Sequence, residues 1–207
     1  MTEHVKVLER LNERRPGCLF VFAGPSGAGK STVCRALLEA LPDIDFSVSH
    51  TTRRPRDDEA EGRHYFFVSD DTFDRMVRED EFAEYATVHG HRYGTSRDEI
   101  EKKLPQADLL LDIDVQGAAQ IRSRYPTATL VFIVPPSLEE LRARLENRKQ
   151  NDARDIERRV AVAKVEISAV GDFDYFIVND RLEDAVDTAK CIIKAERRRV
   201  SRRLRKP

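Results

Sequence analysis

Residues 24–31 read GPSGAGKS, which matches the pattern GxxxxGK(S/T) of a phosphate-binding loop. The glycines let the backbone turn and approach phosphates without a clash from Cβ, and the N–H groups at the start of a following helix attract anions. Lys30 can reach the outer phosphates of a nucleoside triphosphate, and the Ser31 hydroxyl can bind Mg²⁺. The pattern therefore predicts binding of a nucleoside triphosphate together with Mg²⁺.

The residues on either side of the loop support this interpretation. An apolar run at 19–23 predicts the strand that leads into the loop, and residues 30–41 have the pattern of the helix that follows it. A simple Gly/Ser turn between a strand and a helix is the alternative, and the Lys-Ser pair in register argues against it. We expect nine residues to contact the triphosphate: Gly24, Pro25, Ser26, Gly27, Ala28, Gly29, Lys30, Ser31 and Thr32.

Two carboxylates occupy the end of a second apolar run, at 109–114. Asp112 and Asp114 are two residues apart, so on a strand both side chains would point to the same side. Ligands of open α/β sheets bind at the carboxyl ends of the strands. We therefore expect one carboxylate to support Mg²⁺ and the other to face a substrate. Solvated acids at an ordinary strand end are the alternative.

A second polar cluster runs from Ser49 to Arg56, where hydroxyls and arginines follow a short strand pattern at 46–49. The planar guanidinium of arginine can make two charge-assisted hydrogen bonds to one phosphate. Taken alone, an arginine-rich loop is more often solvated surface. The order of this cluster relative to the other motifs is what gives it significance.

Strand patterns and helix patterns alternate along the chain, and these elements must position the residues above. Short apolar runs, typical of buried parallel strands, occur at 19–23, 109–114, 129–134 and 175–178. Helical patterns occur at 30–41, 116–123, 137–149, 155–170 and 183–200, and a capping box, Ser137-x-x-Glu140, starts the third of them. This alternation predicts an α/β fold in which helices cover both faces of a parallel sheet.

A polar stretch at 52–106 interrupts the alternation and predicts an inserted subdomain. Its expected elements are strands at 65–68 and 82–88, a helix near 71–78, and a helix after the capping box Ser96-x-x-Glu99.

The length of 207 residues suits one α/β domain with an insertion. We expect a helical extension at 1–17 and a single domain at 18–207. The insertion at 52–106 would divide the core of this domain into 18–51 and 107–207.

The charge is balanced, with 36 basic and 37 acidic residues, and predicts neither a nucleic-acid nor a membrane partner. The end of the chain, 197–206, is strongly basic, and we favour a solvated helix end over an RNA contact. Cys18, Cys34 and Cys191 are isolated, as in a reduced protein. The chain is charged from Glu3 onward and has no apolar run of membrane-spanning length, so we expect a cytoplasmic protein. The sequence allows a homo-oligomer.

The motifs, in this order, resemble those of bacterial-type guanylate kinases between Cys18 and Glu196. The resemblance rests on GPSGAGKST at 24–32, FSVSHTTRRPR at 46–56, the segment 59–68, EFAE at 81–84, YGT at 93–95, LDIDVQG at 111–117 and IVND at 177–180. It implies a fold like that of P-loop nucleoside triphosphate hydrolases, with a GMP-binding insertion and a lid at about 148–159. It also implies transfer of the γ-phosphoryl group from ATP to GMP or dGMP, in purine nucleotide metabolism and GMP recycling.

The resemblance assigns a role to each site residue. Ser31 and Asp112 would bind Mg²⁺, and the residues that stabilise the transferred charge would be Lys30, Arg53, Arg148 and Arg159. The GMP site would comprise Ser49, Arg53, Arg56, Tyr65, Glu84, Tyr93, Thr95 and Asp114.

Within that GMP site, the resemblance implies that some residues bind the phosphate and others bind the base. Arg53, Arg56, Tyr65 and Tyr93 would hold the phosphate, and Glu84 would accept the hydrogens on N1 and the 2-amino group of guanine. A carboxylate offers two acceptors to these two adjacent donors, and adenine presents no such edge.

The acceptor phosphate is already ionised at neutral pH, so the reaction needs no general base. It needs compensation of charge, because like charges at about 4 Å repel by about 4 kcal/mol per pair at an effective dielectric constant near 20. The lid arginines, Arg148 and Arg159, would contribute to this compensation. The segment between them, at 149–154, departs from the family pattern in that Lys149 replaces a glycine.

Two other functions stay open at this point. A related kinase of a sugar phosphate would keep the phosphate loop but would not need the base-reading pair Glu84 and Asp114. An interaction module that binds a phosphorylated peptide would typically have a degraded phosphate loop and further domains, whereas this loop is intact.

Overall fold

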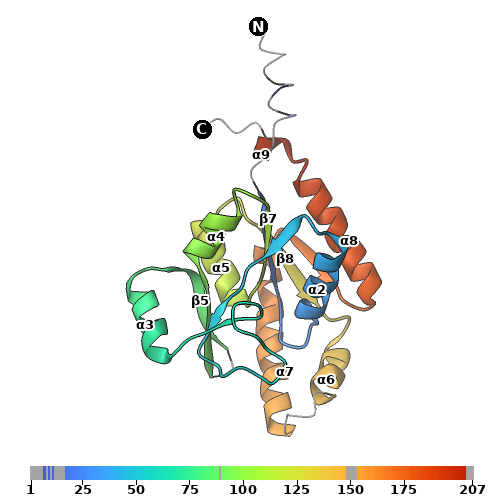
Figure 1. Cartoon of the computed structure of the whole chain (residues 1–207). Helices are drawn as coiled ribbons and strands as arrows, with labels where there is room; N and C mark the ends of the chain where they lie inside the picture. The colour runs from blue at the N-terminus through green and yellow to red at the C-terminus, as the bar shows by residue number, and fades with distance from the viewer. Residues whose placement is uncertain are drawn as a thin grey trace.

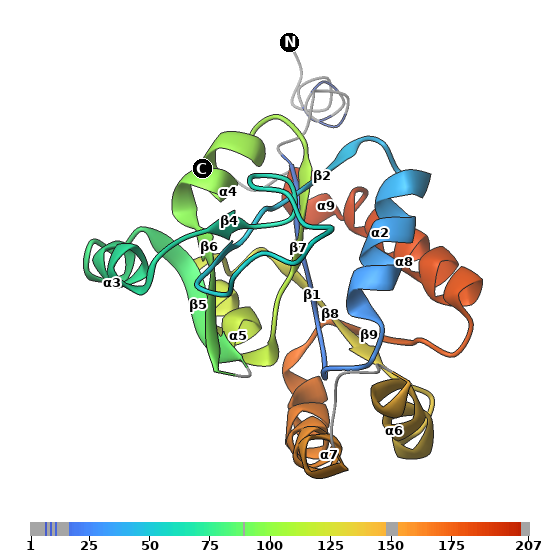
Figure 2. The ribbon, with the colours of Figure 1, turned by 60° about the horizontal axis from the view of Figure 1, so that its bottom comes forward.

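The computed structural model describes Val7, Glu9, Leu11 and residues 17–88, 90–147 and 153–203. Within these residues, five parallel strands form the main sheet, which lies in the middle of the molecule (Figure 1). Their order is β2-β7-β1-β8-β9 (Figure 2). The strands are β1 (Leu19–Ala23), β2 (Ile44–Phe46), β7 (Asp108–Asp112), β8 (Thr129–Val134) and β9 (Tyr175–Val178). The predicted parallel α/β fold is therefore confirmed.

Strand β1 lies at the centre of the sheet because its sequence, LFVFA, is apolar on both faces, and all five residues are buried. Phe20 and Phe22 face a layer formed by α2 (Lys30–Ala40) and α8 (Leu182–Glu196). The alternate residue, Val21, faces the opposite layer, formed by α4 (Arg97–Lys103) and α5 (Val115–Arg124). Figure 2 shows the two layers on opposite sides of the sheet. A strand buried on both faces is what fixes the position of the loop that follows it.

The second sheet has the order β4-β3-β6-β5 in the described chain and lies beside α5 (Figure 2). Its elements are β3 (His50–Thr51), β4 (Phe66–Phe67), α3 (Asp70–Arg78), β5 (Phe82–Val88) and β6 (His91–Ser96). Phe73, Met76 and Phe82 form a small apolar core between the helix and the sheet. Helix α4 (Arg97–Lys103) then returns the chain to the main sheet, where Ile100 is fully buried.

The strand predicted at 46–49 is wrong. Strand β2 ends at Phe46 and β3 starts at His50, because the intervening residues carry the chain from the main sheet to the second one. The backbone N–H of Ser47 still bonds to Leu110 in the main sheet, whereas the carbonyl of Ser49 already bonds to Phe66 in the second. Consequently His50 and Thr51, which the sequence prediction left in the core, pair with the second sheet.

The remaining helices are α5 (Val115–Arg124), α6 (Leu138–Glu146), α7 (Ala153–Ser168), the 3₁₀ helix η1 (Ala169–Asp172) and α9 (Val200–Arg203). Both predicted capping residues are confirmed, since the side chains of Ser96 and Ser137 accept the N–H of the residue three positions later. Helices α6 and α7 pack through a cluster that includes Leu141, Leu145 and Val160. Across the described residues, no helix is long and apolar enough to span a bilayer.

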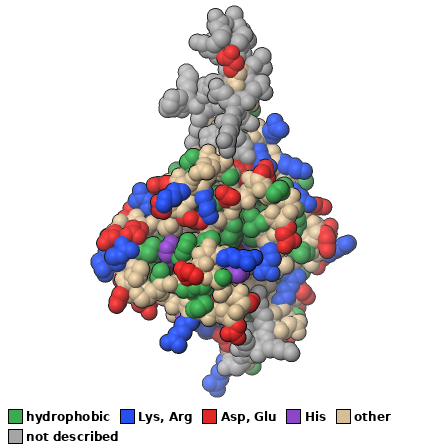
Figure 3. Space-filling view, in the orientation of Figure 1, with side chains coloured by type: hydrophobic (Ala, Val, Ile, Leu, Met, Phe, Trp, Pro, Cys, Tyr) green, Lys and Arg blue, Asp and Glu red, His purple; other side chains and the backbone are tan. Residues whose placement is uncertain are grey.

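The basic end of the chain is tied to the fold by buried carboxylates. The Asp108 side chain is fully buried, accepts the N–H of Cys18 at 2.7 Å and pairs with Arg197 at 2.6 Å. The buried carboxylate of Glu196 accepts hydrogen bonds from Tyr175 at 2.7 Å and Arg202 at 2.7 Å. Arg199 also pairs with Glu196, at 2.9 Å, so at least three of the tail arginines serve the fold. Figure 3 shows basic and acidic side chains interspersed over one face of the molecule, as the balanced composition implies.

We expect Asp108→Asn to lower the free energy of unfolding by about 2 kcal/mol, because it breaks a charge-assisted bond to a mostly buried arginine. Urea unfolding measures this. The matched control is Asp187→Asn, since Asp187 is exposed and pairs with Lys190 on the surface of α8; surface pairs contribute little, so this variant should match the parent. Equal stability of Asp108→Asn and the parent would show that the buried pair does not hold the end of the chain.

Candidate active site

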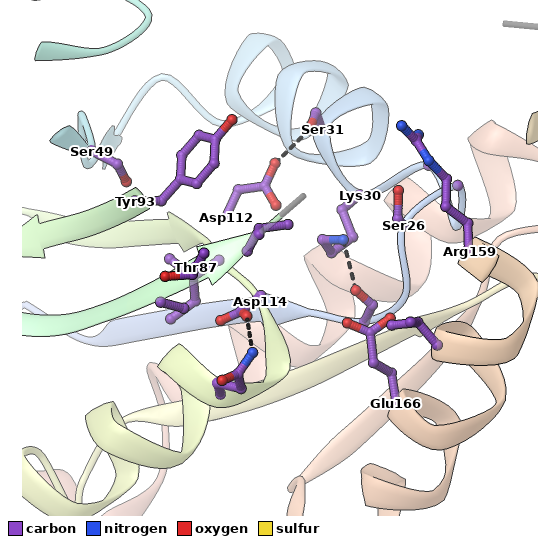
Figure 4. Close-up of a pocket in the computed structure, with 18 of the residues that line it drawn as sticks. Ser26, Lys30, Ser31, Ser49, Thr87, Tyr93, Asp112, Asp114, Arg159 and Glu166 are labelled. Atoms are coloured by element: carbon purple, nitrogen blue, oxygen red, sulfur yellow. Dashed lines mark hydrogen bonds between the residues drawn. The ribbon is translucent and has the colours of Figure 1, made fainter. Parts of the chain in front are cut away.

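A cavity of about 440 Å³ opens at the carboxyl ends of β1 and β7, between the loop after β1, helix α7 and the second sheet (Figure 4). It gathers most of the residues that the sequence singled out. Those that line it are Gly24, Ser26, Gly27, Gly29, Lys30, Ser31, Thr32, Ser49, Tyr65, Glu84, Tyr93, Asp112, Asp114 and Arg159. The predicted residues Pro25, Ala28, Arg53, Arg56 and Thr95 do not line it.

The shape of the phosphate loop depends on the glycine at position 29 and on the side chain of Asn179. Gly29 has a φ of 86°, and a Cβ at that position would lie 2.2 Å from the Asn179 side chain. The Asn179 amide donates to the Ala28 carbonyl at 2.7 Å, and both groups are buried. Ala28 is thus buried, and its carbonyl anchors the loop to Asn179. Only glycine fits a positive φ this close to a neighbouring side chain.

Lys30 lies along the inside of the loop. Its ammonium donates to the carbonyls of Gly24 at 2.7 Å and Pro25 at 3.3 Å, as Figure 4 shows for the first of these. These bonds hold the positive charge at the centre of the loop, where the outer phosphates of a triphosphate would bind. The ammonium has three hydrogens, so phosphate oxygens can replace these acceptors without a change of backbone.

Ser31 and Asp112 form the pair that could hold Mg²⁺. The Ser31 hydroxyl donates to the Asp112 carboxylate at 2.6 Å (Figure 4). Burial raises the pKa of Asp112, and a nearby cation, here Lys30, opposes that rise. Among the described residues no group of three or more His, Cys, Asp or Glu could hold a metal ion. A hydroxyl and one carboxylate fit Mg²⁺ nevertheless, because this ion usually takes one or two protein ligands and completes its shell with phosphates and water.

Asp114 does line the cavity, but the prediction that it lies on the strand is wrong. Strand β7 ends at Asp112, and Asp114 is the N-cap of α5, where its carboxylate accepts the N–H of Gly117 at 2.7 Å and the Gln116 amide at 3.2 Å. Aspartate is favoured at this position because it satisfies an unpaired N–H of the first helical turn. Burial raises the pKa of Asp114, and the bond from Gly117 partly offsets this.

Glu84 on β5 is the most deeply buried carboxylate that lines the cavity, with 3% of its surface exposed. Burial raises its pKa to about 7, while hydrogen bonds from Thr95 favour the ionised form. Thr95 is fully buried and lies behind Glu84, and the Thr95 and Ser49 hydroxyls are 3.4 Å apart. The threonine therefore positions the carboxylate from behind.

Arg53 stands behind two tyrosines that line the cavity. Its guanidinium donates to the Tyr93 hydroxyl at 3.3 Å, lies 5.5 Å from the centre of the Tyr65 ring, and pairs with Glu59 at 2.7 Å. The bond from Arg53 lowers the pKa of Glu59, and burial raises the pKa of Tyr65 to about 12. Arg56 is exposed, and its backbone N–H donates to Glu59.

Helix α7 forms the wall opposite the second sheet. Arg159 faces the cavity and pairs with Asp155 at 2.7 Å. The other predicted lid arginine, Arg148, lies outside the described residues, as do Lys149 and the rest of 148–152.

Glu166, which the sequence reasoning missed, also lines the cavity from α7 (Figure 4). Burial raises its pKa, while Lys30 and the backbone N–H of Ser26 in the phosphate loop favour its ionised form. The signal that could have found it is its spacing of seven residues from Arg159, which places both on one face of the helix.

The fold and the cavity together define a class of protein. A phosphate loop with its lysine, a hydroxyl–carboxylate pair beside it and a second polar pocket in the same cavity are the parts of a P-loop phosphotransferase that acts on a small phosphorylated acceptor.

Comparison with known proteins specifies the family. A family model described as Guanylate kinase matches residues 17–196. The chain is 50% identical to the guanylate kinase of Nitrosomonas europaea over 188 residues, which cover 90% of this chain and 94% of that protein. It is 49% identical to the guanylate kinase of Escherichia coli strain K12 over 189 residues, which cover 90% and 91%.

The structure agrees. The crystal structure of guanylate kinase from Anaplasma phagocytophilum superimposes with a TM-score of 0.77 at 35% identity and covers 92% of each chain. The chain belongs to the guanylate kinase family, and it is an ATP:GMP phosphotransferase.

The buried Glu84 makes stability depend on pH. Its pKa rises from 4.5 to about 7 on folding, so the parent loses stability as the pH increases through this range. Glu84→Gln removes the ionisable group. In the absence of ligand, the stability of this variant relative to the parent should increase by about 3 kcal/mol between pH 4.5 and pH 7 and then stay constant. Denaturant unfolding across this range measures it.

Glu101→Gln is the control for this experiment, because Glu101 is an exposed glutamate on α4. It should leave the dependence of stability on pH as it is in the parent. A constant stability difference between Glu84→Gln and the parent from pH 4 to pH 8 would contradict the burial of an ionisable Glu84.

Proposed function

We propose that this chain catalyses the Mg²⁺-dependent transfer of the γ-phosphoryl group from ATP to GMP and dGMP, in purine nucleotide metabolism and GMP recycling in the cytoplasm. The observation that supports this most strongly is one continuous cavity in which the phosphate loop forms one wall and the buried carboxylate of Glu84 another. The cavity can therefore hold a triphosphate and a nucleotide base at the same time.

The base would be read by Glu84. Its two carboxylate oxygens can accept the hydrogens on N1 and the 2-amino group of guanine, with Ser49 and Asp114 completing the contacts and Thr95 holding Glu84 from behind. Adenine has an acceptor at N1 and would leave the carboxylate unpaired, at a cost of about 1–3 kcal/mol for each buried group. Because this recognition involves only the base, we expect dGMP to be accepted as well.

The phosphate of GMP would be held by Arg53, Tyr65 and Tyr93, with Arg56 approaching from the exposed loop. Because the Tyr93 hydroxyl accepts from Arg53, its own hydrogen is available to a phosphate oxygen. The pair with Glu59 keeps the guanidinium of Arg53 fixed before the ligand arrives. We propose accordingly that the second sheet and α3 form the GMP-binding subdomain.

The triphosphate would bind to the loop from Gly24 to Thr32. Lys30 would hold the outer phosphates, and Ser31 and Asp112 would hold Mg²⁺, which neutralises phosphate charge when bound. The short bond between Ser31 and Asp112 places both oxygens beside the loop before any ligand binds.

Charge compensation is the main task in this reaction. The acceptor oxygen of GMP is ionised at neutral pH, so no side chain has to remove a proton. Lys30 and Arg159 line the cavity and Arg53 lies behind Tyr65 and Tyr93, so three different elements would bring positive charge towards the transferred group. The protein takes little covalent part in such reactions. We assign Arg148 the same role and propose that residues 148–159 act as a lid that closes over the phosphates and excludes water.

The two alternative functions explain less of the site. A sugar phosphate kinase has no use for a buried carboxylate in the acceptor pocket, and a module that binds phosphorylated peptides has no use for Lys30 and the Ser31–Asp112 pair.

A coupled assay with ATP, Mg²⁺ and a panel of nucleoside monophosphates tests the proposal. We expect GMP and dGMP to be phosphorylated and AMP, CMP and UMP to react far more slowly, because only guanine presents two donors to Glu84. Lys30→Ala and Arg53→Ala should each reduce kcat by about 100-fold or more, since each removes a cation near the transferred group.

The control is Arg54→Ala, which removes an exposed arginine beside Arg53 and should keep the activity of the parent. Turnover of AMP as fast as that of GMP would refute the role of Glu84. Near-normal activity of the Lys30 or Arg53 variant would refute the role of that residue.

A further inference from the structure

Strand β5, which carries Glu84, lies at the edge of the second sheet. An edge strand presents N–H and C=O groups that no neighbouring strand can satisfy. At Tyr85 a side chain from another element satisfies them. The Tyr85 N–H donates to Oε1 of Gln120 at 3.2 Å, and Nε2 of Gln120 donates to the Tyr85 carbonyl at 2.7 Å. The carboxamide thus takes the place of the peptide group of a further strand.

Gln120 belongs to α5, the helix whose first turn supports the Glu84 carboxylate. A Cβ at Gly117 would lie 2.3 Å from Oε2 of Glu84, so this carboxylate rests against the bare backbone of Gly117. Gly117 and Gln120 are three residues apart and therefore neighbours on one side of the helix. One helix thus contacts Glu84 at its side chain and contacts the next residue, Tyr85, at its backbone.

The strand is irregular immediately before Glu84. The pairing between β5 and β6 shifts between Phe82 and Glu84, so that Ala83 is an extra residue in β5. Bulges of this kind redirect the following side chain and disrupt the local ladder. Here Ala83 faces the main core while Glu84 faces the cavity. The backbone beside Glu84 therefore has less support from its own sheet, and the two bonds to Gln120 supply it.

We propose that Gln120 is a positioning residue for guanine recognition: its carboxamide fixes the backbone of β5 so that the Glu84 carboxylate meets both donors of the base. This inference rests on the proposed role of Glu84. Glutamine suits the task because one planar group carries both a donor and an acceptor at the distance of a peptide group. Glutamate has the same length but only acceptors when it is ionised, and alanine has neither.

A second link joins the same helix to the insertion and supplies the matched control. Arg124 lies one turn after Gln120 and pairs with Asp80 at 2.5 Å, in the turn between α3 and β5. Arg124→Ala loosens the attachment of the insertion to α5 without removing a contact beside Glu84. This variant therefore distinguishes a general loosening of the insertion from a loss of the positioning of Glu84.

The test compares GMP with inosine monophosphate, which has the N1 hydrogen but lacks the 2-amino group. The quantity of interest is the ratio of kcat/KM for the two substrates, measured with saturating ATP and Mg²⁺. For Gln120→Ala we expect this ratio to decrease about tenfold, mainly through a higher KM for GMP, with the KM for ATP within twofold of the parent. Gln120→Glu keeps the length and shape of the side chain and should show the same decrease, so a folding defect of the alanine variant does not decide the outcome. Arg124→Ala should keep the ratio of the parent.

Glu84→Gln, measured in parallel, separates the two hypotheses. If Glu84→Gln lowers the ratio but neither Gln120 variant does, Gln120 has no positioning role. If Glu84→Gln also leaves the ratio unchanged, the assigned role of Glu84 is wrong, and the inference fails with it. A decrease in Arg124→Ala as large as in Gln120→Ala would likewise overturn the inference.

Discussion

Repulsion between two phosphate groups that must come into contact is the constraint on which the arrangement of this molecule depends. Three elements place cations in the cavity or directly behind its wall: Lys30 on α2 and Arg159 on α7 line it, and Arg53 in the insertion lies behind Tyr65 and Tyr93. Each cation is already held by oxygen acceptors, which are the loop carbonyls, Glu59 and Asp155 respectively. The acceptors hold the cations in place before a ligand binds, so that less entropy would be lost if phosphate oxygens bind them as proposed.

For the acidic side chains of the same cavity, the cost is the burial of a negative charge. Burial raises the pKa of Glu84, Asp112 and Asp114, so each carboxylate is kept at a cost to stability near neutral pH. Each is compensated by a specific partner: Thr95 for Glu84, the Ser31 hydroxyl and Lys30 for Asp112, and the first turn of α5 for Asp114. Pairs of this kind, with shifted pKa values in one pocket, are typical of functional sites. The main sheet supplies the rigidity that makes such an arrangement possible.

The sequence predicted best those strands that are continuous apolar runs, including β9 at the edge of the sheet, where Phe176 and Val178 are exposed. The strands at 19–23, 129–134 and 175–178 agree with β1, β8 and β9 to the residue, because continuous apolar runs leave little choice of register. The prediction was wrong at 46–49, where the chain changes sheets, and at Asp114, where capping ends the strand early. Gln120 left no signal in a local pattern, since it acts through the backbone of a strand distant in the sequence. For Glu166 the only local signal is its helical spacing from Arg159, and its link to the backbone of Ser26 is between segments far apart in the chain.

Recognition of guanine by the buried Glu84 carboxylate, as proposed, requires this side chain to lose its proton when GMP binds. In the protein without ligand, Glu84 has a pKa of about 7. A carboxylate that accepts hydrogen bonds from both guanine donors must be ionised. Calorimetry of GMP binding at pH 6.5, in buffers of different ionisation enthalpy, counts the protons released. The parent should release about three-quarters of a proton more than Glu84→Gln. The phosphate of GMP contributes equally to both proteins, so its contribution cancels when the two values are subtracted. Equal proton release by the two proteins would contradict the proposal that the Glu84 carboxylate binds guanine.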